Sequence, residues 1–275
     1  MQTGRSTKDG NDRAVSEAIG FILIFGIIIA GIGLVALWGY PMLLQQQSSS
    51  DEQIMEKNLI VLQNDVKSLA YKTVPYKETS LKVSGGTLTV YNTTTPTSSY
   101  FSIYGSGNDI KKDDGTYATA SSPLIFSLGD IRYVSTSAQT GMSLENGAVV
   151  KRMLAQTGST MLAEPRWFYD SQTNTAVIYL IGFNTTDVMA LSGVGTVNMQ
   201  LDQTKTNSNP YPIPAGDTIY VKYTPNANAD YSTAWGNYFK NTLGLSGPNA
   251  TQWYSFPTTT QQLVINRYEI KINIV

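Results

Sequence analysis

The chain has 275 residues, with 19 Lys and Arg against 20 Asp and Glu and a formal net charge of −1. This balance excludes a binder of duplex nucleic acid, which needs a basic surface to replace phosphate counterions. Cysteine and histidine are both absent, which excludes disulfides, Cys/His zinc sites, and Ser-His-Asp or Cys-His catalysis. We therefore predict no metal, no cofactor and no enzymatic function.

The first expected element is an apolar helix that follows a short polar leader, residues 1–13. Residues 18–40 carry no charged side chain. As a helix they are about 35 Å long, enough to cross a hydrocarbon core of about 30 Å. Secretory signals have shorter apolar regions, of about 7–15 residues, followed by a small-residue cleavage site that this chain lacks. We therefore predict a retained, single-pass transmembrane helix.

The leader indicates which way the helix crosses the membrane. Arg5, Lys8 and Arg13 precede the apolar segment, and positively charged flanks remain in the cytoplasm. We expect a cytoplasmic N-terminus and an extracellular C-terminal domain, on the cell membrane or the cell surface.

The helical pattern continues over residues 14–74. Pro41 and the polar run after it leave two alternatives, one bent helix or a break near 41–50. Beyond the run, apolar residues recur in steps of four and three, which predicts a helix with one apolar seam. That seam packs on the chain's own head domain, on neighbouring subunits, or on both, and we favour the first. The seam residues are Met55, Leu59, Leu62, Val66 and Leu69.

Residues 75–275 have the short alternating segments and turn residues of antiparallel β structure. Residues 81–90 predict a hairpin with its turn at Gly85-Gly86. Residues 175–183 predict a central strand, and residues 267–274 a terminal strand with alternating faces. Residues 230–243 predict a short helix. The fold class is therefore α+β, a long N-terminal transmembrane and stalk helix followed by a mainly antiparallel β-sandwich-like head.

The leader and the start of the apolar helix resemble a known signal. The sequence DRAVSEAIGFILIFGIIIAGIGL resembles the class III signal of archaeal type IV pilin-like proteins. Further along, LKVSGGTLTV, SLENGAVVKR, AEPRW and AVIYLI resemble a family of uncharacterised archaeal pilin-like surface proteins. The resemblance implies that a prepilin peptidase cuts between Arg13 and Ala14. It also implies that the apolar helix stays in the mature chain and assembles with other pilin subunits.

Small residues on the apolar helix are candidates for assembly contacts. Gly26, Ala30 and Gly33 lie at intervals of four and three, hence on one helix face, where membrane helices approach closely. The alternative is that glycine is simply common in membrane helices.

Glu17 is the candidate polar residue for assembly. The resemblance implies that its carboxylate pairs with the free amine of Ala14 in a neighbouring subunit, although Glu17 is the fourth residue after the cut where the fifth is usual. Two alternatives are a solvated interfacial residue and an acid favoured by the helix dipole.

Three Asn-X-Thr triplets are acceptors for glycosylation in an exported chain, at Asn92, Asn184 and Asn249. A chain rich in Thr and Asn also forms such triplets by chance.

The sequence thus predicts a type IV pilin-like subunit, major or minor, of a surface filament or a secretion or adhesion apparatus. The alternative is a membrane-anchored surface domain that binds a glycan or protein ligand without polymerising. An anchored carboxylate hydrolase is the third reading, since paired acids cleave glycosides without histidine. Its candidate acids are Glu145, Glu164, Asp170 and Glu269.

Overall fold

The computed structural model describes residues 9–72, 74–94, 98–187 and 189–275, with side chains from residue 16 onward. The chain divides into two compact units, Met1–Ser50 and Asp51–Val275. The second unit contains the last part of the long helix together with the β structure, so the head begins before the first strand.

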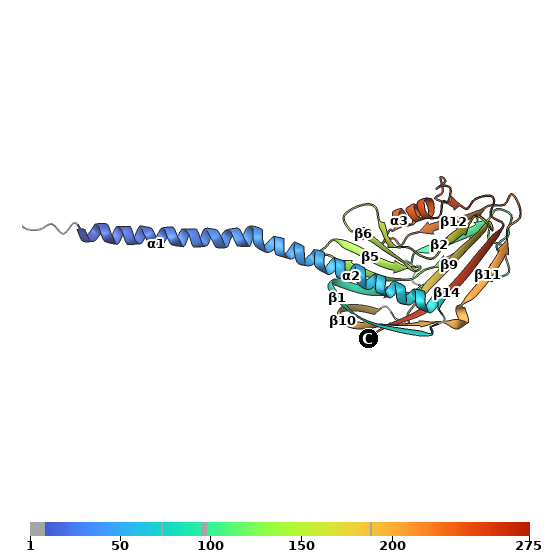
Figure 1. Ribbon diagram of the computed structural model, residues 1–275, viewed down its shortest axis with the longest axis horizontal. Helices are drawn as coiled ribbons and strands as arrows, with labels where there is room; N and C mark the ends of the chain where they lie inside the picture. Colours follow the sequence, from blue (N-terminus) through green and yellow to red (C-terminus); the bar gives the residue numbers. More distant parts are fainter. Residues whose placement is uncertain (1–8, 73, 95–97, 188) are drawn as a thin grey trace, which may run out of the picture. The chain divides into compact units, whose positions relative to one another are not determined.

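The N-terminal helix is continuous across Pro41. It comprises α1 (Asp9–Leu34), a π-helical turn η1 (Val35–Gly39) and α2 (Tyr40–Tyr71). The π turn ends just before Pro41, where the N–H of Tyr40 donates to the carbonyl of Val35. Because proline has no N–H and its ring clashes with the preceding turn, a widened turn at this point accommodates it without a break. Of the two alternatives at Pro41, the unbroken helix is observed (Figure 1).

Residues 51–71 of α2 belong to the head and cover one face of its larger sheet. The predicted seam residues are all fully buried there. Their neighbours in this core include Leu88, Ile270 and Ile272 of the sheet. The prediction that the seam packs on the chain's own head is confirmed.

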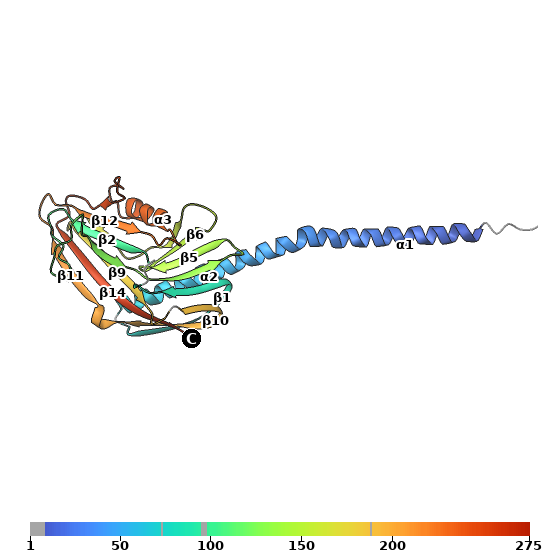
Figure 2. The ribbon, with the colours of Figure 1, turned by 180° about the vertical axis from the view of Figure 1, so that it is seen from behind.

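The described strands form two sheets, seen from opposite sides in Figures 1 and 2. The larger sheet has ten strands. Nine of them follow the order β7 (Thr160–Ala163), β6 (Ala148–Met153), β5 (Thr140–Glu145), β4 (Asp130–Ser135), β1 (Tyr76–Tyr91), β10 (Met189–Leu201), β14 (Gln262–Ile274), β9 (Thr175–Asn184) and β8 (Phe168–Asp170). The tenth, β11 (Asn207–Pro212), also pairs with β14.

The smaller sheet has the order β13 (Tyr254–Ser255), β12 (Ile219–Thr224), β2 (Tyr100–Gly105) and β3 (Leu124–Ser127). Three short helical segments complete the head: η2 (Gln203–Lys205), α3 (Ser232–Asn237) and η3 (Tyr238–Thr242). Among the described strands the pairing is antiparallel except between β9 and β14, which run parallel.

Two hydrophobic cores lie on opposite faces of the larger sheet. Alternate residues of β9 show the division: Ile178 and Leu180 face the smaller sheet, whereas Ile181 and Phe183 face α2. The predicted fold class is therefore confirmed, an α+β protein with two packed sheets and a long apolar N-terminal helix.

The predicted hairpin at residues 81–90 is wrong. These residues belong to one strand, β1, and the pair Gly85-Gly86 forms a bulge rather than a turn. Gly85 has a φ of +68°, and a Cβ on Gly86 would collide with the backbone oxygen of Val134. In a regular strand Leu81 and Leu88 lie on opposite faces, because an odd number of positions separates them. The bulge adds residues and shifts this alternation, so both side chains enter the same core. The chain therefore continues in one direction through Gly85-Gly86 instead of reversing there.

The other predicted elements of the head are confirmed. Residues 175–183 form β9, and in β14 Ile270 and Ile272 are buried as the alternation predicted. The predicted helix runs from Ser232 to Thr242 through α3 and η3. Its N-cap is Tyr231, and Asp230 just before it accepts a hydrogen bond from the N–H of Ser232 at 2.8 Å.

Candidate functional site

The most prominent surface feature is the apolar side of the long helix. None of residues 16–50 is buried, and large apolar side chains are exposed from Ile19 to Leu44. Trp38, near the end of the apolar segment, is 77 % exposed. Contiguous apolar surface of this extent marks a contact with lipid or with other protein. By length and composition the helix is a candidate membrane anchor.

Four glycines of this helix have no packing partner within the described part of the chain: Gly20, Gly26, Gly31 and Gly33. A Cβ added to Gly26 or to Gly33 would meet no atom within 4 Å, and the same holds for Gly31. Gly26, Ala30 and Gly33 lie within about 60° of one another around the helix axis, whereas Gly31 lies about 140° from Gly26. The first three therefore form an open small-residue face.

The predicted processing and pairing residues lie at the start of α1. Arg13 and Ala14 are on its helical backbone, but their side chains lie outside the described residues. Glu17 is exposed. Cleavage after Arg13 and pairing of Glu17 with Ala14 of a neighbour stay predictions.

The three glycosylation triplets differ in the engagement of their asparagine amides. Nδ2 of Asn184 donates to Glu269 at 2.7 Å, and Nδ2 of Asn92 donates to the carbonyl of Thr185 at 3.4 Å. Asn249 is exposed, and its Oδ1 accepts from the N–H and the hydroxyl of Thr251. Within the described residues no hydrogen bond engages Nδ2 of Asn249, so this amide is the most accessible of the three.

The four acids nominated for a hydrolase lie in different surroundings. Glu145 is buried, while Glu164 is exposed and accepts a hydrogen bond from Thr242 at 2.9 Å. Asp170 accepts from the N–H of Gln172 in a turn, and Glu269 accepts from Asn184 and Lys205. Among the described contacts none joins two of these carboxylates. A hydrolytic role for these acids stays a prediction.

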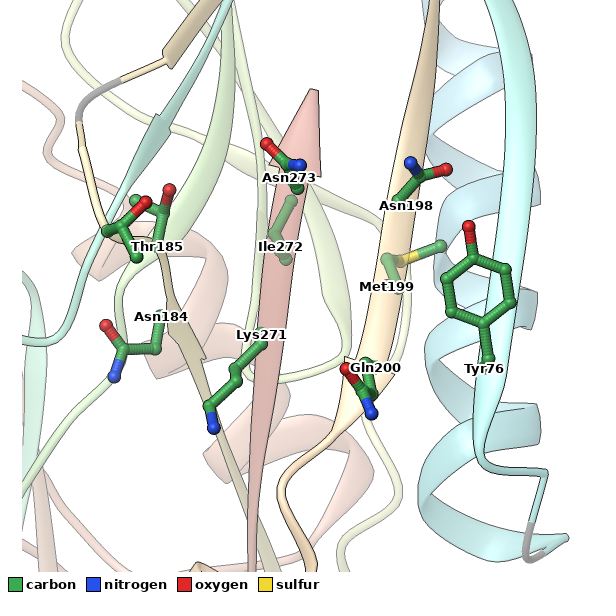
Figure 3. A pocket seen from close by; sticks show the side chains of 10 residues that line it. Tyr76, Asn184, Thr185, Asn198, Met199, Gln200, Lys271, Ile272 and Asn273 are labelled. Atoms are coloured by element: carbon green, nitrogen blue, oxygen red, sulfur yellow. The ribbon is translucent and has the colours of Figure 1, made fainter. Parts of the chain in front are cut away.

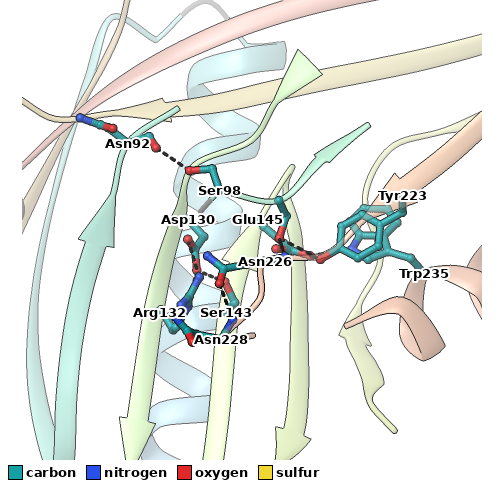
Figure 4. A network of polar contacts seen from close by, with 11 residues as sticks. Asn92, Ser98, Asp130, Arg132, Ser143, Glu145, Tyr223, Asn226, Asn228 and Trp235 are labelled. Atoms are coloured by element: carbon teal, nitrogen blue, oxygen red, sulfur yellow. Dashed lines mark hydrogen bonds and ion pairs between the residues drawn. The ribbon is translucent and has the colours of Figure 1, made fainter. Parts of the chain in front are cut away.

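Glu145 belongs to a buried polar network between the two sheets (Figure 4). Its Oε1 accepts a hydrogen bond from Tyr223 at 2.8 Å and one from the indole N–H of Trp235 at 2.6 Å. Burial, together with the nearby charge of Asp130, raises the pKa of Glu145 to about 7, and the two hydrogen bonds oppose that rise. The network thus joins β5, β12 and α3 inside the head.

The ion pair in the same network was not predicted. Arg132 binds Asp130 in a bidentate manner, with distances of 2.8 and 3.0 Å, and Ser143 donates to Asp130 at 2.9 Å. Burial raises the pKa of Asp130, and the Arg132 guanidinium opposes that rise. The signal in the sequence was Asp130 and Arg132 two residues apart on one strand, which puts both on one face. Because the same spacing is typical of an ion pair on a solvent-exposed face, the sequence did not indicate that this pair is buried.

A groove of about 520 Å³ lies on the head, across the ends of β9, β14, β10 and β1 (Figure 3). Amide and hydroxyl side chains line it, among them Asn184, Thr185, Asn198, Gln200 and Asn273. The sequence places Asn198 and Gln200 of β10 and Asn273 of β14 in alternation with apolar residues, hence on the opposite strand face. It did not identify the groove, because it gave no order for the strands that bring them together.

Together these features define an α+β protein with a long apolar N-terminal helix, a candidate membrane anchor, and a two-sheet head. The chain belongs to the family described as "Family of unknown function (DUF7289)", which matches residues 13–273. It is also similar to an "Uncharacterized protein" of Archaeoglobus fulgidus, with 25% identity over 186 residues. That match covers 59% of this chain and 61% of the relative, so the chain spans less than two thirds of the relative's length. No solved structure matches the chain.

Proposed function

We propose that this protein is a type IV pilin-like subunit, anchored by its N-terminal helix and assembled with other subunits into a surface filament or a related apparatus. The observation that carries the proposal is the exposed apolar helix with its open small-residue face. In the proposed topology the N-terminus is cytoplasmic, the head is extracellular, and a prepilin peptidase removes residues 1–13. The partners are membrane lipid before assembly and other pilin subunits after it.

The chemistry of the helix suits a subunit that leaves the bilayer for a polymer. Leu, Ile and Phe side chains are stable in lipid and also when packed against other helices. Gly26, Ala30 and Gly33 let a neighbouring helix approach closely.

Glu17 is the residue on which this proposal can be tested directly. A carboxylate at the start of an apolar segment is costly to bury unless a cation compensates its charge. We expect Glu17→Ala to reach the membrane in normal amount but to form fewer filaments, because the compensating partner is lost. Glu17→Asp keeps the charge and is the matched control. Membrane fractionation and electron microscopy of sheared filaments measure the two steps, and a normal filament yield from Glu17→Ala contradicts the assigned role.

A second function, that of a membrane-anchored binding domain that does not polymerise, is favoured by the polar groove on the head. The two functions differ in the mature N-terminus and in the presence of filaments. A chain that remains monomeric in the membrane with an uncut leader has the second function.

A further inference from the structure

The groove in Figure 3 is built from residues that are direct neighbours across four strands. In one row Tyr76 of β1 pairs with Gln200 of β10, Gln200 with Lys271 of β14, and Lys271 with Asn184 of β9. Two residues along, Asn198 pairs with Asn273. Because alternate residues of a strand share a face, both rows point to the same side of the sheet. The groove therefore presents an array of amides whose spacing is set by the sheet.

Two ion pairs flank the groove, while Glu78, which is exposed and accepts a hydrogen bond from the hydroxyl of Tyr76, has no ion-pair partner among the described residues. Nζ of Lys271 lies 2.9 Å from Asp202, and Glu269, which binds Asn184, lies 2.9 Å from Lys205. Hydrogen bonds from the hydroxyl of Thr204 and from Lys271 lower the pKa of Asp202 to about 2, so this carboxylate is ionised at neutral pH. Besides the Lys271 ammonium, the hydrogen-bonding groups that line the groove are amides and hydroxyls, which both donate and accept. With the Glu78 carboxylate beside it, such a surface disfavours an anion, and its amides and hydroxyls suit an uncharged polar ligand.

Asn198 has an unused acceptor. Its Oδ1 is buried and has no hydrogen-bond partner among the described residues. A buried acceptor without a partner is destabilising. A hydroxyl donor from a ligand in the groove removes that destabilisation.

Tyr76 supplies an apolar surface on the β1 side of the groove. Its side chain is 46 % exposed, and its hydroxyl donates to Glu78 at 3.2 Å. An exposed aromatic ring beside an array of amides matches the two sides of a sugar, whose C–H face is apolar and whose rim carries hydroxyls. The volume of about 520 Å³ lies within the usual range of small-ligand sites.

We propose that this groove binds a neutral saccharide, with Tyr76 stacking on a sugar ring and with Asn198, Gln200 and Asn273 hydrogen-bonding its hydroxyls. This site goes beyond the proposed pilin-like function and does not depend on it. The groove lies on the head, so the proposal applies equally to a filament subunit and to a monomeric surface protein.

The test uses the full chain in lipid nanodiscs, because detergents with sugar headgroups compete for such a groove. Four neutral disaccharides serve as probes: maltose, cellobiose, mannobiose and diacetylchitobiose. Digalacturonate is the charged comparison. Binding is measured by saturation-transfer NMR and by calorimetry up to millimolar concentration. Tyr76→Ala and Gln200→Ala test the groove, and Tyr117→Ala is the matched control, since Tyr117 is 52 % exposed and does not line it.

We expect saturable binding of at least one neutral probe. Its affinity falls about tenfold in Tyr76→Ala and in Gln200→Ala, and changes less than about twofold in Tyr117→Ala. Circular dichroism of each variant checks that the head remains folded. The proposal is overturned if none of the neutral probes binds, if digalacturonate binds in preference to them, or if the two groove variants bind as the original chain does.

Discussion

Glu145 accepts hydrogen bonds from two aromatic side chains, Tyr223 and Trp235, in the interior of the head. A buried carboxyl is stabilised in its neutral form unless its charge is compensated. The Arg132 guanidinium favours ionisation of Glu145, but Arg132 is already paired with Asp130. Burial therefore dominates, and Glu145 holds a proton more firmly in the folded head than in the unfolded chain.

The expected consequence is a pH-dependent stability. The pKa of Glu145 rises from 4.5 to about 7 on folding, so its contribution is greatest below about pH 4.5 and is lost as the pH rises through about 7. We expect the free energy of unfolding to fall by about 2 kcal/mol between about pH 5 and pH 8 on this account. Glu145→Gln keeps an acceptor for Tyr223 and Trp235 and removes the titration. Urea unfolding of both chains across this range measures the difference, and parallel pH curves contradict the assignment.

At the scale of elements, the second half of α2 is an integral part of the head. Its seam side chains are fully buried against the larger sheet, while Ile54 on the same helix remains 41 % exposed. A helix that merely extended from the head would show no such contrast.

Truncation of the seam is therefore expected to destabilise the head. Leu62→Ala removes a fully buried side chain and leaves a cavity, which costs about 2–5 kcal/mol. Ile54→Ala removes an exposed side chain from the same helix and costs less than about 1 kcal/mol. Denaturant unfolding of the head, followed by tryptophan fluorescence, compares them. Equal losses of stability in the two variants are incompatible with the packing described.

The small-residue face of α1 gives a second prediction at this scale. Gly26→Leu places a large side chain on that face, and Gly31→Leu places the same side chain on a different side of the helix. Neither new Cβ meets an atom of the chain, so both variants are expected to fold and to enter the membrane. We expect fewer filaments only from Gly26→Leu, because close helix approach needs a small residue there. Electron microscopy measures the number of filaments for each variant. An equal reduction in both variants, or a normal number in both, contradicts the assignment of this face to helix contacts.

The elements differ in how far their sequence predicted them. The α2 seam and β14 were predictable because their apolar spacing follows one regular period over several turns or residue pairs. The Gly85-Gly86 bulge was not, because two glycines after an alternating run fit a hairpin turn equally well. What separates the two is the pairing of β1 with β10 on both sides of the bulge, a contact distant in sequence.

Prediction of the sites requires long-range contacts even more than prediction of the helices and strands does. The exposed helix could be identified from the absence of charge over residues 18–40 alone. The groove and the Glu145 network join strands whose order local periodicity does not specify, including the parallel pair β9 and β14. In the sequence these residues are therefore polar or acidic positions on separate strands, and no local pattern indicates that they lie close together.

At the scale of the whole molecule, the chain combines an apolar helix, in which none of residues 16–50 is buried, with a head that has two cores. In our account the first unit moves from lipid into a helical bundle, and the head is carried with it to the cell surface. This requires that the leader is removed and that the apolar helix is kept.

The mature N-terminus tests that requirement most directly. Intact-mass and N-terminal peptide mass spectrometry of the native protein, purified from sheared surface filaments and from membranes, identifies it. Our account predicts a chain that begins at Ala14 and retains residues 18–40 in both fractions. A chain that begins beyond Tyr40, or one that keeps residues 1–13 in every fraction, contradicts it.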